Sequence, residues 1–466
     1  MQKPPNPASI FELVARYEAM VDNGDPIFLD ETSYSQLVYH YEQEAQFDRA
    51  LEVVDLALSH FAFSIDFHLK KAELLLDQGL SDESLQMLDR ASALAPGEPE
   101  VELLRAEVFI DLSAFDSARD ILDELKPGAS GTLLSHILTV EGIMYEAQGL
   151  YEQMYYVLDT ALREDPSNTD AIEYLWVSLE ACKKYREGLE ILEHVLDYDP
   201  YISQAWFYLG HIRAYFVDYD EAINCYEYAF LSDPRFEAAY RECAELCLEN
   251  KLFHKALGIY EEVFELFEPD SDLLLRLGQC HQALGRVKVA RSFYMQVLTH
   301  DPLDDEVLFH IGLCHALEGQ WNKAIRYYKR AIQIEEGREE FYDALAFAYQ
   351  QVGKIDVARA YYEQAVATAP EQGLYWAHFA CFLLETGQGM EAIDLLDEAE
   401  DIATGHELTY CRIGCLFQLG RRQEGLYRLG EALTEYYEQH QTLFDMMPGL
   451  ANDSDITSMI SAYYST

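Results

Sequence analysis

Apolar residues recur along this chain with the period of an α-helix, and they do so twice in every 34 residues. In the middle of the chain, Leu209 and Gly210 lie on one face of a first helix, and Ala222 and Tyr226 lie on one face of a second. Pro234 ends the second helix, because proline lacks a backbone N–H and its ring clashes with the preceding turn. The pattern predicts a helix-turn-helix unit.

Three sets of positions repeat at the same 34-residue interval. One is an alanine in the second helix: Ala222, Ala256, Ala290, Ala324, Ala358 and Ala392. Another is the proline after that helix: Pro166, Pro200, Pro234, Pro302 and Pro370, with Glu268 and Glu336 in the two gaps. The last is a glycine in the first helix, at Gly210, Gly278 and Gly312, with alanine in the same register at Ala244, Ala346 and Ala380. Three interlocked sets with one period predict a repeat array rather than a series of separate globular domains.

The repeat resembles the tetratricopeptide repeat, whose motif is Trp-x2-Leu-Gly-x2-Tyr, then Ala-x3-Phe-x2-Ala, then Pro. The matching residues here are Trp206, Leu209, Gly210, Ala222, Tyr226, Ala229 and Pro234. Arg213 stands where the family prefers tyrosine. The resemblance implies an all-α fold, an α-solenoid wound as a right-handed superhelix of about twelve helix-turn-helix units. It also implies that the first helix of each unit lines a concave surface.

The repeat pattern divides the chain into four expected parts. They are an N-terminal capping helix and linker (1–30), units one to three (31–131), units four to twelve (132–434) and a helix end with a tail (435–466). The break near residue 131 rests on a two-residue slip of the pattern at Met154. In the first part, Ser9 and Glu12 match a capping box. We read this helix as a cap on the array, and the alternative is that it docks on a partner.

Trp176 interrupts the series of small residues in the first helices, and Gly188 replaces the alanine in the second helix of the same unit. A large and a small residue that exchange sides would keep the summed volume of the core. The sequence therefore predicts that Trp176 fills the space above Gly188.

The formal charge of −50, from 83 acidic against 33 basic residues, disfavours binding to nucleic acid or to an anionic membrane. The chain is 50% hydrophobic, which is too apolar for a disordered protein. No run of about 18 apolar residues predicts a membrane span. The nine cysteines include no Cys-x-x-Cys pair, a usage typical of free thiols in a cytoplasmic protein.

Motifs for catalysis and cofactors are weak. Residues 387–392 match Gly-x-Gly-x-x-Ala, but they lie between two predicted helices rather than after a strand. Two Cys-His pairs, at His281 and His315 with the preceding cysteines, invite a zinc site. Neighbouring residues on a helix point about 100° apart, so four ligands would not converge. We expect buried, hydrogen-bonded histidines there, and no catalytic, cofactor or metal site.

The concave positions of the first helices are rich in carboxylates and carry one basic residue. The candidate groove residues are Glu73, Asp77, Glu107, Asp111, Asp170, Glu173, Glu180, Phe207, His211, Tyr215, Arg241, Phe309, Leu313 and Phe347. Acidic residues dominate the early units and apolar residues the later ones, so we expect a partner protein or peptide segment that is basic toward one end and apolar toward the other. The alternative is a solvated acidic face with an unrelated role.

These patterns favour a non-catalytic binding scaffold or adaptor. Other interpretations stay open: a peptide-sensing regulator, an accessory subunit whose catalytic chain is separate, or an array that associates with itself through exposed solenoid ends.

Overall fold

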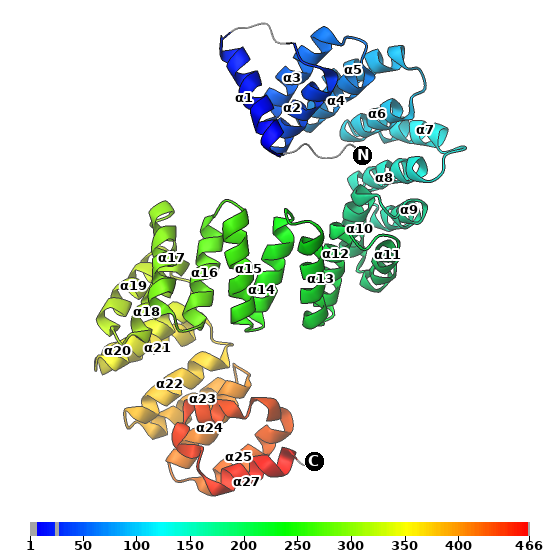
Figure 1. Cartoon of the computed structure of the whole chain (residues 1–466). Coiled ribbons are helices and arrows are strands. Elements are labelled where there is room, and N and C mark those ends of the chain that lie inside the picture. The colour runs from blue at the N-terminus through cyan, green and yellow to red at the C-terminus, as the bar shows by residue number, and fades with distance from the viewer. Residues whose placement is uncertain (1–6, 24–27, 465–466) are drawn as a thin grey trace. The chain divides into compact units, whose positions relative to one another are not determined.

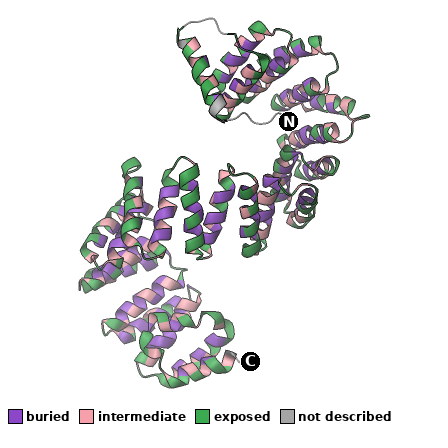
Figure 2. Ribbon diagram, viewed as in Figure 1, coloured by how far each residue is buried: buried purple, intermediate pink, exposed green. Residues whose placement is uncertain are grey.

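The computed structural model describes residues 7–23 and 28–464, and most of them lie in α-helices that pack in consecutive pairs (Figure 1). The chain forms two compact units, residues 1–239 and 240–466. In both units the helices carry buried and exposed residues in alternation along the ribbon, as expected for helices that pack on their neighbours on one side (Figure 2). Within the described ranges, no helix has the length and apolar character needed to cross a membrane.

The first unit contains α1 and six helix pairs. Its helices are α1 (Pro7–Asn23), α2 (Glu31–Gln43), α3 (Phe47–His60), α4 (Ile65–Asp77), α5 (Ser81–Leu94), α6 (Pro99–Asp111), α7 (Phe115–Leu125), α8 (Thr132–Ala147), α9 (Tyr151–Glu164), α10 (Thr169–Cys182), α11 (Tyr185–Tyr198), α12 (Ser203–Tyr215) and α13 (Tyr219–Ser232). The first helix of a pair also contacts the first helix of the next, so that α4, α6, α8, α10 and α12 form a continuous layer.

The second unit contains six further pairs and a C-terminal group of short helices. Its helices are α14 (Glu237–Glu249), α15 (Phe253–Leu266), α16 (Ser271–Ala283), α17 (Val287–His300), α18 (Asp305–Leu317), α19 (Trp321–Ile334), α20 (Glu339–Gln351), α21 (Ile355–Thr368), α22 (Gly373–Glu385), α23 (Gly389–Glu400), α24 (His406–Gln418), α25 (Arg422–Glu435), α26 (Gln441–Met446) and α27 (Ser454–Tyr464). Counted over the described residues, α2 to α25 make twelve pairs, which confirms the predicted α-solenoid of about twelve units.

Several helix pairs are held together by a tyrosine that packs on a glycine. A Cβ atom added to Gly278 would lie 2.3 Å from the ring of Tyr294, and one added to Gly312 would lie 2.4 Å from the ring of Tyr328. Both tyrosines are fully buried. The repeating glycine of the first helix therefore makes room for a ring of the second helix, and this contact sets how closely the two helices approach.

The turns within the pairs use one residue with a positive φ angle, and one of these residues is a poor fit. Glycine fills the position in several turns, as at Gly285 with φ 72°. The turn between α12 and α13 has Val217 instead, with φ 64°. A β-branched side chain is strained in this left-handed region.

Replacing Val217 with glycine is therefore expected to raise the free energy of unfolding by about 1 kcal/mol. Urea unfolding followed by circular dichroism would measure the change. Val289→Gly on the exposed face of α17 is the matched control, and it should lower stability by a few tenths of a kcal/mol because glycine weakens a helix. A loss of stability in both variants would contradict the prediction that the backbone at Val217 is strained.

The N-terminal helix differs in detail from the expectation. Helix α1 begins at Pro7, so Ser9 lies within the helix and is not its N-cap. The prediction of a capping box at Ser9 is wrong, and the Ser9 side chain lies outside the described residues. Tyr17 of α1 is buried next to Tyr41 of α2, with ring centroids 6.3 Å apart. The linker residues 24–27 also lie outside the described part of the chain.

The C-terminal group packs where the last pair lacks its tyrosine. Gly414 of α24 continues the glycine series, but Gly430 of α25 stands at the place of the tyrosine ring. Met447, the residue directly after α26, fills this space: a Cβ atom on Gly414 would lie 2.2 Å from its sulfur. The Tyr463 hydroxyl of α27 donates a hydrogen bond to the Gly430 carbonyl over 3.1 Å. The segment after the last repeat therefore replaces a missing core side chain.

Candidate functional site

Four consecutive first helices of the first unit line an open cavity of 540 Å³, which we call the acidic cavity. Its walls come from α4, α6, α8 and α10, and they combine carboxylates with an apolar floor. The lining residues are Leu69, Glu73, Glu100, Leu103, Leu104, Glu107, His136, Thr139, Val140, Ile143, Asp170, Glu173 and Tyr174. No lysine or arginine is among these described lining residues. The cavity offers a negative surface with apolar contacts.

Glu107 is the most perturbed carboxyl group of the acidic cavity. Burial raises its pKa to about 7, and the charges of Glu73, Asp170 and Asp77 act in the same direction. A cation that binds near Glu107 would offset this repulsion. The site is therefore electrostatically suited to a positively charged group.

The structure brings together four of the seven predicted acidic residues. Glu73, Glu107, Asp170 and Glu173 line the acidic cavity. Glu73 also accepts a hydrogen bond from Lys70 Nζ over 2.9 Å, so one of the four charges is partly neutralised.

The remaining three predicted acids lie on the same layer of helices but do not line the cavity. Asp77 is the exposed last residue of α4, close enough to Glu107 to affect its pKa. Asp111 ends α6 and accepts a hydrogen bond from Ser81. Glu180 is exposed near the end of α10.

The predicted groove residues of α12 are Phe207, His211 and Tyr215, and they make two separate aromatic contacts. The ring centroids of Phe207 and His211 are 4.5 Å apart, and the Tyr226 hydroxyl shares a hydrogen bond of 3.0 Å with His211 Nδ1. Burial lowers the pKa of His211 to about 4, so this side chain is neutral at physiological pH. Tyr215 is exposed and packs on Tyr185 instead, with centroids 4.1 Å apart.

Trp176 belongs to this aromatic group, and the predicted exchange with Gly188 is wrong. A Cβ atom on Gly188 would meet Leu179 at 2.6 Å and Ile212 at 3.0 Å, so these two side chains fill the space. Trp176 is only half-buried and stacks on His211, with ring centroids 5.2 Å apart. Branched aliphatic side chains reach over the glycine, and the flat indole packs on other rings.

Arg241, the one predicted basic groove residue, is part of an ion-pair network in the second unit. Its guanidinium lies 3.0 Å from Asp270 and 3.4 Å from Asp272. Its positive charge is therefore already matched by carboxylates of α16 and of the residue before it.

A second cavity lies within the second unit, and we call it the apolar cavity. It is open to solvent, has a volume of 710 Å³ and is lined by the first helices α18, α20, α22 and α24, by two second helices and by α26. The lining residues are Leu313, Ala316, Leu317, Trp321, Tyr328, Asp343, Ala344, Phe347, Gln350, Tyr362, Leu374, His378, Cys381, Phe382, Glu385, His406, Glu407, Thr442, Asp445 and Met446. The predicted residues Leu313 and Phe347 meet here. Phe309 packs on Phe341, at 4.7 Å between centroids, and is not among the lining residues.

The apolar cavity is also lined by carboxylates and two histidines, and each histidine contacts a carboxylate. His378 Nδ1 and Asp343 Oδ2 are 2.9 Å apart, and this contact raises the pKa of His378 against the opposing effect of burial. His406 Nδ1 lies 3.0 Å from Glu407. Glu385 and Asp445 add two exposed carboxylates, and the lining contains no lysine or arginine among the described residues.

Sequence reasoning missed several lining residues, which share one position of the repeat. Each lies one residue after the position of the repeat that Glu173, Phe207 and Arg241 occupy: Leu104, Val140, Tyr174, Ala344 and His378. A residue four places after one inward position and three places before another lies on the same helical stripe. This spacing was the available signal, and it would have found His378.

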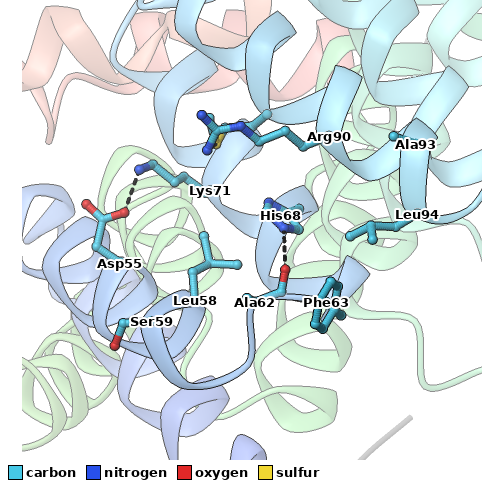
Figure 3. Close-up of a pocket in the computed structure, with 11 residues that line it drawn as sticks. Asp55, Leu58, Ser59, Ala62, Phe63, His68, Lys71, Arg90, Ala93 and Leu94 are labelled. Atoms are coloured by element: carbon cyan, nitrogen blue, oxygen red, sulfur yellow. Dashed lines mark hydrogen bonds and ion pairs between the residues drawn. The ribbon is translucent and has the colours of Figure 1, made fainter.

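A third cavity, of 510 Å³, lies among α3, α4 and α5 (Figure 3). Lys71 Nζ lies 2.5 Å from Asp55, and His68 Nε2 lies 3.1 Å from the Ala62 carbonyl oxygen. Lys71 and His68 are therefore already engaged by other groups of this cavity, whereas Arg90 lies 4.0 Å from the Met87 sulfur. Figure 3 shows Leu94 and the exposed Phe63 at the other end of this pocket.

The two histidines of the Cys-His pairs are buried. His315 Nδ1 lies 3.2 Å from Gln320 Oε1, which confirms the expected hydrogen bond. His281 differs, because its Nδ1 is buried without a hydrogen-bond partner and its ring stacks on Phe293 at 5.5 Å. Over the described residues, no three side chains of His, Cys, Asp or Glu form a group that could hold a metal ion.

Comparisons with known proteins point to one repeat family. Residues 69–131, 272–303, 305–338 and 339–372 match the family described as tetratricopeptide repeat. A solved tetratricopeptide repeat protein from Parabacteroides merdae ATCC 43184 is similar over 56% of this chain and 98% of its own, with 13% identity and a TM-score of 0.44.

Two curated proteins are similar over part of the chain. ER membrane protein complex subunit 2 of Xenopus tropicalis is 26% identical over 154 residues, which are 31% of this chain and 51% of that protein. Protein bimA of Emericella nidulans is 22% identical over 168 residues, which are 36% of this chain and 21% of that protein. The chain thus spans about half the length of the Xenopus relative.

Proposed function

The chain belongs to the tetratricopeptide repeat family, and from this premise we propose that it is a non-catalytic scaffold that binds a segment of a partner protein through its first helices. The observation that carries the proposal is the acidic cavity. Carboxylates from three helices line one apolar-floored space whose described lining lacks lysine and arginine. A segment with lysine or arginine side chains and small apolar contacts would complement it.

The raised pKa of Glu107 supports a cationic partner. Glu107 is held among Glu73, Asp170 and Asp77, and burial together with mutual repulsion makes its charged form unfavourable. A lysine or arginine of the partner would replace this repulsion with attraction in a partly desolvated place. The affinity of the proposed scaffold for a segment would therefore depend more strongly on the sign of the segment's charge than on which apolar side chains it carries.

The test uses the full chain and a fluorescein-labelled peptide of alternating lysine and glycine. We expect anisotropy to detect binding that weakens when NaCl rises from about 50 to about 500 mM. Asp170→Lys with Glu173→Lys should weaken binding about tenfold or more, which corresponds to about 1.4 kcal/mol. Both side chains are exposed, so the fold should tolerate the change.

The matched control is Asp82→Lys with Glu83→Lys, which makes the same charge change in the first turn of α5. These residues are exposed and lie on a second helix, outside the acidic cavity. An equal loss of affinity in both double variants would reject the cavity as the site and leave only attraction to the net charge of −50.

A second candidate role is that of an accessory subunit in a multi-chain assembly. The Xenopus relative is by its name a subunit of a complex. In that role the partner segment would belong to another subunit, and the catalytic or membrane-embedded parts would lie in other chains. Size-exclusion chromatography of native extract, with an antibody to detect the chain, would separate the two roles: elution at the mass of the monomer would reject the assembly.

A further inference from the structure

We infer that the apolar cavity of the second unit docks a partner segment in which large apolar side chains flank a lysine or arginine. This inference rests on the proposed role as a binding scaffold, but it concerns other residues, another unit of the chain and another chemistry. It names an occupant anchored by apolar side chains, whereas the acidic cavity selects mainly by charge.

The first observation is exposed apolar surface gathered in one concave place. Leu317 and Phe347 are 64% and 45% exposed, and both line the apolar cavity together with half-buried Leu374. The volume of 710 Å³ falls within the range of about 300–1,000 Å³ that is usual for ligand pockets. Two or three apolar side chains of a partner would remove this surface from water.

The second observation is the charge at the border of that surface. Glu385 and Asp445 are exposed, and no lysine or arginine is among the described lining residues to neutralise them. Asp343 uses one carboxylate oxygen for His378, while its Oδ1 is buried without a hydrogen-bond partner. An unpaired buried acceptor favours an incoming donor. These groups specify a cation beside the apolar anchors.

The third observation explains why the cavity has a wall on its C-terminal side. Because Gly430 replaces the core tyrosine of the last pair, Met447 packs against Gly414 and holds the end of α26 there. Met446 and Asp445 of α26 then line the cavity. With Thr442, the wall thus contributes an apolar, an acidic and a hydroxyl side chain, and the first two repeat the combination that the rest of the cavity presents.

The experiment measures binding of short labelled peptides to the full chain by fluorescence anisotropy. The probe has the sequence Leu-Lys-Phe-Leu, and two matched probes carry glutamate in place of lysine or serine in place of the three apolar residues. We expect the lysine probe to bind at least about tenfold more tightly than either. Equal binding of the lysine and glutamate probes, or no binding of the lysine probe at about 1 mM, would overturn the inference.

Variants locate the binding. Leu317→Ser with Phe347→Ser should weaken the lysine probe about tenfold or more. The control is Leu303→Ser with Tyr427→Ser, which removes two side chains that are 68% and 67% exposed elsewhere in the second unit. Equal effects of the two double variants would overturn the inference. Circular dichroism confirms that each variant keeps its helices.

A second pair of variants addresses the charge. Glu385→Gln should reduce the preference for the lysine probe over the glutamate probe, while Asp394→Asn, on the exposed face of α23, should leave it unchanged. An unchanged preference in Glu385→Gln and in Asp343→Asn would reject the electrostatic part.

A chemical readout follows occupancy directly. Cys381 is half-buried in the cavity wall, so the bound probe should slow its alkylation by iodoacetamide, as located by peptide mass mapping. Cys182, half-buried in the first unit, serves as the internal reference. If Leu317→Ser with Phe347→Ser instead abolished a dimer of the full chain, the cavity would belong to a second copy and the inference would fail.

The two proposals fail independently. The acidic-cavity variant Asp170→Lys with Glu173→Lys should leave binding of the Leu-Lys-Phe-Leu probe unaffected, and the serine variants of the apolar cavity should leave binding of the lysine–glycine peptide unaffected. If only the Leu-Lys-Phe-Leu probe fails to bind the wild-type chain, the apolar docking site is rejected. If only the lysine–glycine peptide fails to bind, the acidic cavity is rejected.

Discussion

Replacing Tyr294 with alanine is expected to lower the free energy of unfolding by about 3–5 kcal/mol. The ring is fully buried between the helices of its pair, and its hydroxyl donates a hydrogen bond to Gln282 Oε1 over 3.0 Å. Its loss leaves a cavity that the glycine opposite, Gly278, has no side chain to fill. Urea unfolding followed by circular dichroism would measure the change as a lower midpoint of the transition.

The same contact predicts that the effect of Gly278→Ala on the free energy of unfolding has opposite signs in the wild-type chain and in the Tyr294→Ala chain. In the wild-type chain the new methyl group would lie 2.3 Å from the Tyr294 ring, so overpacking should cost about 1–3 kcal/mol. In the Tyr294→Ala chain that clash is gone, and alanine should stabilise the helix by about 0.5–1 kcal/mol relative to glycine. A double-mutant cycle would therefore show strong coupling between the two positions.

Gly258 on α15 provides the control, because it is also a glycine inside a helix but a methyl group added to it would have no neighbouring atom within 4 Å. Gly258→Ala should stabilise the chain by about 0.5–1 kcal/mol in both backgrounds. Destabilisation by Gly258→Ala equal to that by Gly278→Ala would mean that close packing on Tyr294 is not the reason for glycine in the repeat.

Much of the fold could be predicted because the repeats share one set of physical constraints. A glycine opposite a ring and an alanine in the second helix let the two helices of a pair pack closely, a proline ends the second helix, and several units repeat these residues in register. The constraint is local to a unit and its neighbours. It therefore predicts helix pairs well, and it carries little information where a unit departs from the pattern.

The departures show what the repeat pattern lacks. The side chains of Leu179 and Ile212, and not that of Trp176, fill the space above Gly188. Several side chains surround a position that has lost its own side chain, and the volume of a residue does not determine which neighbour fills the space. At Gly430, the missing tyrosine predicts a replacement, but its source is Met447, which lies beyond the last repeat. Such choices depend on tertiary contacts that a period does not encode.

The sequence predicted the chemical character of the residues that line the two cavities, but it did not predict all of those residues. Inward positions of the first helices pointed to carboxylates early in the chain and to apolar residues later, and Glu107 and Phe347 both line cavities. His378 and the α26 residues were absent from the prediction. His378 lies one residue past an assumed inward position, and α26 follows the last repeat, outside the pattern from which the groove was assigned.

Glu107→Gln is expected to stabilise the chain by about 3 kcal/mol at pH 8, because the substitution removes a charge that the fold holds unfavourably. The pKa of Glu107 is about 7 in the folded chain against an ordinary value of 4.5. Between these values the folded chain keeps a proton that the unfolded chain has released. Stability therefore falls as pH rises through this window, and the full cost is present above about pH 7.

At pH 5.5 the folded carboxyl is largely protonated, so the advantage of Glu107→Gln should shrink to about 1 kcal/mol. Urea unfolding of both chains at the two pH values measures the difference. Glu83→Gln on α5 removes the same charge from an exposed place, and it should change stability little at either pH. An equal gain from both substitutions would attribute the effect to the net charge of −50 rather than to burial among Glu73, Asp170 and Asp77. The unfavourable free energy of the charged Glu107 carboxylate then indicates how strongly this position would attract a positive charge of a binding partner.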